Sequence, residues 1–114
     1  MLNEFDGDDP LSQALGAVAH PVRRDLLERV RGNPSRVTDL AAGYEMSLAA
    51  VSRHLKVLES AGLVSRSVEG RDHFIAARVE GWNEVAGWVE RQSAAWNARL
   101  LALKQIMESD DGDA

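Results

Sequence analysis

The sequence predicts a mainly α-helical domain with one small β-hairpin, about five helices and two strands in all. Apolar residues recur at helical spacing in five segments, and two short strand-like segments flank a glycine turn at residues 69–71. With 114 residues, 45% of them hydrophobic, the chain is long enough to bury the core of a single domain. It has no cysteine, which excludes disulfides, thiolate catalysis and cysteine metal sites.

The first predicted helix carries Leu11 and Leu15 on its apolar face. It ends at His20-Pro21, because proline disfavours a helical residue before it and is well tolerated as the first residue of the next helix. The second helix then runs to the Gly-Asn-Pro-Ser loop at residues 32–35.

A short third helix is predicted around residues 37–42 and ends at Gly43. Ser47 has the chemistry of an N-cap and is expected to start a fourth helix. Apolar residues of that helix recur at spacings of three and four and form one stripe: Leu48, Val51, Leu55 and Leu58. Gly62 is typical of the residue that follows a helix C-terminus.

Residues 63–68 and 72–77 are predicted strands, joined by a turn whose glycine tolerates a positive φ. The last predicted helix spans about residues 81–107. Its apolar residues cover a sector of roughly 160°, whereas roughly 100° is expected for a helix that lies on one core. Because this helix is on the order of 40 Å long, we expect its apolar face to need a partner surface.

Two interpretations of the last helix are open. Its three tryptophans fill the core of one chain, or a second copy packs against the helix in a symmetric interface. We favour the second interpretation and predict a homodimer. Its expected interface residues are Leu11, Leu15, Trp82, Val85, Trp88, Val89, Trp96, Leu100, Leu103 and Met107.

Two helices joined by a tight turn, then a strand, a glycine turn and a strand, are the element order of a winged helix-turn-helix. The second helix of such a pair enters the DNA major groove. Opposite its apolar stripe, the fourth helix presents small residues near its start and then Arg53 and Lys56, which suit contacts with phosphates and base edges. Arg66 and Arg71 lie in the hairpin, where a wing reaches the adjacent DNA backbone.

Two stretches resemble the ArsR/SmtB-type family of bacterial repressors. Residues 19–27 (AHPVRRDLL) look like its opening signature, and residues 47–64 (SLAAVSRHLKVLESAGLV) are similar to its recognition helix almost residue by residue. The resemblance covers about residues 11–107 and implies a homodimeric repressor that releases a palindromic operator when it senses an effector. The positions that it implies at the DNA are Ser47, Ala49, Ala50, Ser52, Arg53, His54, Lys56, Arg66 and Arg71.

Many members of that family sense metals through cysteines before the recognition helix, or through Asp, His and Glu on the last helix. Here residues 37–43 hold no cysteine or histidine, and the last helix has no histidine. His20 is expected to cap a helix or to be satisfied in the core, and His54 and His73 to contact DNA or solvent. We therefore expect no metal and no cofactor, and place the chain in a subgroup that lacks the metal-site cysteines and histidines. The sequence does not say whether an effector exists; the place to look for its pocket is between the first helix and the last helix.

The net charge of −5 is unevenly distributed. Residues 1–9 carry −4, residues 20–73 carry +2 and residues 74–114 carry −3, so the expected DNA-binding stretch is mildly basic. The acidic ends, residues 1–9 and 109–114, are predicted to be disordered tails around one domain at residues 10–108. Nothing resembles a secretion signal or a membrane span, which predicts a cytoplasmic protein without a membrane partner.

A second hypothesis is a winged-helix protein interaction module with vestigial DNA contact, because Leu48, Ala49 and Ala50 give the fourth helix few base-reading side chains. An enzyme is a distant third. The sequence has no G-x-S-x-G motif, no glycine-rich phosphate loop and no paired carboxylates beside a histidine. We therefore predict a sequence-specific, DNA-binding transcriptional regulator without enzymatic activity.

Overall fold

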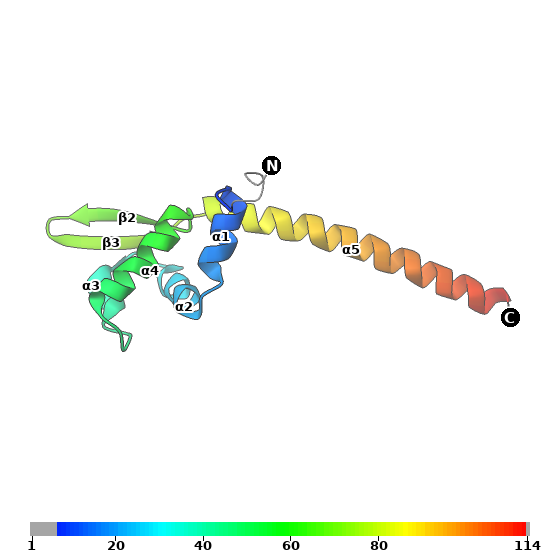
Figure 1. Ribbon diagram of the computed structural model, residues 1–114, viewed down its shortest axis with the longest axis horizontal. Helices are drawn as coiled ribbons and strands as arrows, with labels where there is room; N and C mark the ends of the chain where they lie inside the picture. The colour runs from blue at the N-terminus through cyan, green and yellow to red at the C-terminus, as the bar shows by residue number, and fades with distance from the viewer. Residues whose placement is uncertain (1–6, 114) are drawn as a thin grey trace.

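The computed structural model describes residues 7–113, with side chains described as far as residue 109. Within these residues, five helices and a three-stranded antiparallel sheet form a small domain from which one helix projects (Figure 1). The elements are α1 (Pro10–Val18), α2 (Pro21–Val30), β1 (Ser35–Arg36), α3 (Val37–Ala41), α4 (Leu48–Ser60), β2 (Val64–Glu69), β3 (Asp72–Ala77) and α5 (Glu80–Asp113). This order confirms the predicted winged helix-turn-helix.

Side chains cap the N-termini of α2 and α4. The Nδ1 atom of His20 accepts a hydrogen bond from the backbone N–H of Val22 at 3.1 Å, at the start of α2. The hydroxyl of Ser47 accepts one from the backbone N–H of Ala50 at 3.1 Å, at the start of α4. Each cap satisfies a backbone donor that has no partner within its helix. The capping roles predicted for His20 and Ser47 are therefore confirmed.

The sheet has the strand order β1-β3-β2 and contains one strand more than predicted. β2 and β3 pair with Val64 opposite Ala77, and Gly70, with φ at 65°, closes the turn between them. β1 adds Ser35, opposite Ile75, on the other side of β3. The sequence predicts a loop before α3, because a strand of two residues is too short to show the alternation that indicates a strand.

The core lies where α2, α3 and α4 meet the sheet. Its largest fully buried side chains are Leu26, Val30, Val51, Leu55, Leu58, Leu63, Val64 and Ile75. Full burial of one such side chain contributes about 1.5–3 kcal/mol. The core therefore fixes how α4 is rotated relative to the sheet.

The start of α5 fits closely against the residues that follow α4. The backbone N–H of Gly81 donates a hydrogen bond to the carbonyl of Gly62 at 2.9 Å. A Cβ atom at position 81 would lie 2.5 Å from the carbonyl oxygen of Ala61 and 2.9 Å from a methyl carbon of Leu63. Only glycine fits this contact without displacing backbone.

Beyond its first turns, α5 extends away from the domain (Figure 1). The molecule measures 74 × 36 × 24 Å with a radius of gyration of 20.4 Å, whereas a compact chain of this length has about 13 Å. All side chains from residue 88 to residue 109 are exposed. None of the helices in the described part of the chain is long and apolar enough to cross a membrane.

The end of α5 differs from the prediction. The helix continues past Met107 to Asp113 and so includes residues 109–113, which were expected to be a disordered tail. No proline or glycine occurs between Gly87 and residue 112, so nothing in the sequence interrupts the helix earlier. Of the other predicted tail, residues 1–6 lie outside the described residues.

The Gly81 contact gives a first prediction. Gly81→Ala should lower the free energy of unfolding by about 1–3 kcal/mol, because the new methyl group overlaps the carbonyl of Ala61. Urea denaturation followed by circular dichroism measures this change. Gly16→Ala in α1 is the matched control, since nothing lies within 4 Å of a Cβ there. An equal stability of both variants would contradict the close contact at Gly81.

Candidate nucleic-acid interface

α4 has one buried and one exposed face. Val51 and Leu55 are fully buried against the core, while Ala49, Arg53 and Lys56 are exposed. Small side chains thus lie near the start of the exposed face and basic side chains lie further along it. This arrangement allows a helix to enter a DNA groove and to contact phosphates and base edges.

The other residues predicted to face DNA lie on or beside this surface, with different exposure. Ser47 and Arg71 are also exposed, whereas the half-buried members of the set are Ala50, Ser52, His54 and Arg66. Ser52, Arg66 and Arg71 line one depression of about 250 Å³ between α3, the start of α4 and the wing. The structure therefore brings the wing arginines beside the first turns of α4.

Arg36 belongs to the same depression, although the sequence analysis did not select it. It lies in β1, with its guanidinium 5.8 Å from the ring centre of Phe74 and 3.7 Å from a carboxylate oxygen of Asp72. Because β1 was not predicted, no sequence signal placed this arginine next to the wing. Its position adds a third arginine to Arg66 and Arg71 on this surface.

Arg66 is held from two sides. Its Nε atom is 3.7 Å from a carboxylate oxygen of Glu59 near the end of α4, and its Nη1 atom is 3.5 Å from Nδ1 of His73 on β3. These contacts connect the wing to α4. They also leave Arg66 less free than Arg71, which lies exposed at the turn.

His54 points toward α2 rather than lying with the exposed residues of α4. Its ring centre is 4.5 Å from that of His20, and Nη1 of Arg23 donates a hydrogen bond to its Nδ1 atom at 3.2 Å. Arg23 also donates to the carbonyl of Ala17 at 2.7 Å. Partial burial, followed by the nearby positive charges of His20, Arg23 and Arg53, lowers the pKa of His54 below 6.5. In this position the neutral imidazole joins α4 to the junction of α1 and α2.

Tyr44 holds the turn between α3 and α4 against α2. Its hydroxyl donates a hydrogen bond to the carboxylate of Asp25, which also accepts one from Nε of Arg29 at 2.8 Å. Burial of the phenol, and then the bond to Asp25, raises the pKa of Tyr44 to about 12. The tyrosine is therefore protonated and acts as a donor at neutral pH.

The residues predicted to form a dimer interface are largely uncovered in this single chain. Trp82, Trp88 and Trp96 are 39%, 38% and 62% exposed, so the interpretation that all three fill the core of one chain is wrong. Leu11, Leu15 and Val85 are half-buried near the contact of α1 with α5. The remaining members are exposed along α5: Val89, Leu100, Leu103 and Met107.

Metal-ligating side chains do not gather on the described residues. Among the side chains of residues 7–109, no group of three or more His, Cys, Asp or Glu lies close enough to hold a metal ion. His20 and His54 are paired with each other, and His73 lies on the wing beside Arg66.

The fold, together with the small and basic side chains that α4 and the wing expose, defines a winged helix-turn-helix protein of the DNA-binding class. A family model described as a helix-turn-helix domain matches residues 18–66. The chain is 31% identical over 101 residues to the HTH-type transcriptional regulator Rv2034 of Mycobacterium tuberculosis, an alignment that covers 89% of this chain and 92% of that protein.

Two solved structures support the same class of protein. The crystal structure of an ArsR family transcriptional regulator aligns with a TM-score of 0.73 and 30% identity, over 77% of this chain and 91% of that one. An ArsR-like transcriptional regulator from Rhodococcus sp. RHA1 aligns with a TM-score of 0.72 and 30% identity, over 85% and 92%. The chain therefore belongs to the ArsR family of DNA-binding transcriptional regulators, a family of regulators and not of enzymes.

The contact of His54 with α2 predicts a pH effect. Because the pKa of His54 is lowered in the folded chain, the unfolded chain binds a proton at this histidine at a higher pH than the folded chain does. The free energy of unfolding therefore falls as the pH drops through 6.5. His54→Gln should lose less stability than the wild type between about pH 7.5 and about pH 5.5. Urea denaturation at both pH values measures the difference. A His54→Gln variant whose stability depends on pH in the same way as that of the wild type would contradict the contact.

Proposed function

We propose that this protein is a homodimeric repressor that binds a palindromic operator through α4 and the wing. Two observations carry the proposal: α4 exposes Ala49, Arg53 and Lys56, and Ser52 of the same helix lines one depression with the arginines of β1 and the wing, Arg36, Arg66 and Arg71. A helix of this kind reads base edges in the major groove, while a basic hairpin contacts the flanking backbone. Since its partner is DNA, the protein acts in the bacterial cytoplasm.

Each basic side chain has a role in this proposal. Arg53 lies one turn into the exposed face of α4 and carries the planar donor group that pairs with guanine in the major groove. Lys56 lies almost one turn further along and supplies a charge for the phosphate backbone. Arg36, Arg66 and Arg71 contact phosphates or the minor groove beside the recognition helix.

The exposed apolar side of α5 supports the homodimer. Trp96, Leu100 and Leu103 are each about half exposed or more and lie within one sector of the helix. A soluble monomer rarely leaves so long an apolar stripe in water. When two copies bury it around a two-fold axis, the two α4 helices are related by that axis and bind half-sites about one helical turn of DNA apart.

The role of the basic residues is tested with DNA from upstream of the gene. Arg53→Ala should weaken binding by about 1–3 kcal/mol and relax the preference at one base position, whereas Lys56→Ala should mainly reduce the salt dependence of binding. Fluorescence anisotropy across a series of salt concentrations measures both. Arg31→Ala removes an exposed charge from α2 and is the control. If the wild type shows no salt-dependent binding below micromolar concentration at low salt, the proposed function is wrong.

The dimer is tested with two lysine substitutions on α5. Leu103→Lys places a charge on the apolar stripe and should raise the dissociation constant of the dimer at least about tenfold. Gln105→Lys adds the same charge about 200° around the helix and should leave the dimer intact. Analytical ultracentrifugation at micromolar concentration distinguishes the two. A monomeric wild type, or equal behaviour of both variants, would exclude this interface.

A further inference from the structure

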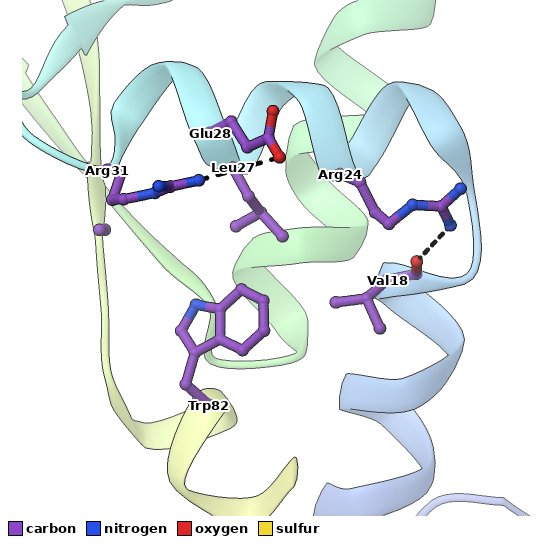
Figure 2. A pocket seen from close by; sticks show the side chains of 7 residues that line it. Val18, Arg24, Leu27, Glu28, Arg31 and Trp82 are labelled. Carbon is purple, nitrogen blue, oxygen red and sulfur yellow. Dashed lines mark hydrogen bonds and ion pairs between the residues drawn. The ribbon is translucent and has the colours of Figure 1, made fainter. Parts of the chain in front are cut away.

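We propose that a cavity beneath α2 binds a small molecule with a flat apolar body and a carboxylate group. The cavity, here called the Trp82 pocket, has a volume of about 510 Å³ and lies between α1, α2, the end of β3 and the start of α5 (Figure 2). Ligand pockets commonly have volumes of about 300–1,000 Å³ and are lined mainly by apolar side chains with a few polar groups. None of the residues that line this cavity belongs to α4.

The interior of the Trp82 pocket is apolar. Trp82 projects from the first turn of α5 toward Leu27 on α2, and Val18 at the end of α1 points into the same space (Figure 2). Ala77 at the end of β3 completes this lining. The indole of Trp82 remains 39% exposed, so one flat ring is available to stack against an aromatic or similarly flat ligand.

The charged groups of the pocket favour an anion. Arg24 and Arg31 lie at the pocket with one carboxylate, that of Glu28. Arg31 and Glu28 are 3.8 Å apart and their side chains are 75% and 67% exposed, so this pair is weak and both ends are free to move. Arg24 donates a hydrogen bond to the carbonyl of Val18 at 2.8 Å (Figure 2). Two guanidinium groups against one carboxylate leave a positive charge that suits a bidentate carboxylate ligand.

The location of the pocket links a ligand to α4. One wall is α2, which contacts α4 through Arg23, His20 and His54. Another is the start of α5, the helix on which the proposed dimer rests. A ligand that fits only one arrangement of these elements shifts the protein toward that arrangement and so changes the relation between the two α4 helices. This regulatory part of the inference rests on the proposed function.

Binding is tested by titration of isotope-labelled, full-length protein in nuclear magnetic resonance experiments. Each of the three tryptophans gives one indole N–H signal, and Trp82→Phe assigns the signal of Trp82. 2-Naphthoate should shift the Trp82 signal saturably, whereas 2-naphthylmethylammonium, with the same ring and the opposite charge, should bind at least about tenfold more weakly. The absence of a saturable shift, or equal shifts with both probes, would overturn the proposal.

Variants locate the bound probe. Ala77→Phe fills the cavity and should abolish the shift of Trp82, and Arg24→Gln should weaken 2-naphthoate binding at least about fivefold. Arg29→Gln removes a charge from the other side of α2, where it pairs with Asp25, and should bind as the wild type does. If Ala77→Phe fails to fold, Arg24→Gln and its control carry the test alone. Binding that appears only in the Leu103→Lys variant, at a concentration at which that variant is monomeric, would show that the partner's helix occupies the pocket and would overturn the proposal.

Anisotropy with operator DNA, with and without 2-naphthoate, separates this inference from the proposed function. A change in DNA affinity in the wild type that is lost in Ala77→Phe supports the regulatory role. If the protein binds no DNA while the Trp82 titration succeeds, the proposed function fails and the pocket stands. If DNA binding is normal and the titration fails, the pocket alone is wrong.

Discussion

Burial of one stripe of α4 is the constraint on which the rest of the structure depends. Leu55 and Leu58 are completely inaccessible, and a rotation of α4 by one residue, about 100°, would turn both leucines away from the core. Because each buried leucine contributes about 1.5–3 kcal/mol, packing of the core allows only one rotation of α4 about its axis. The side chains that α4 exposes are thus determined by the residues on its buried face.

Polar contacts around α4 add specificity to that apolar packing. Arg23 reaches across the junction of α1 and α2 to His54, and Tyr44 connects the helix-turn-helix turn to Asp25. Such partly exposed hydrogen bonds are individually worth about 0.5–1.5 kcal/mol, or more when one partner is charged. They therefore contribute less to stability than the core does, but they define how α2 lies relative to α4.

The sequence predicted the helices, the hairpin and the caps because periodicity and cap chemistry are local. The positions of single side chains were predicted less well where they depend on residues distant in the sequence. His54 lies at the border of the apolar stripe, three residues after Val51, so spacing alone allows it to face either way, and only His20 on α2 settles the direction. Arg36 could not be selected because its neighbour Asp72 is far away in the sequence. The breadth of the apolar sector on α5 correctly indicated that one domain would leave it uncovered.

The contact between Gly62 and Gly81 gives the molecule a mechanical property. It is the joint between the DNA-reading domain and a helix that extends far beyond it, and at this joint backbone rests directly on backbone. The homodimer proposed above contains two such joints between its two α4 helices, so a small change of angle at each joint becomes a larger displacement of α4. In the proposed complex, these two glycines thereby set the precision with which the separation of the half-sites is measured.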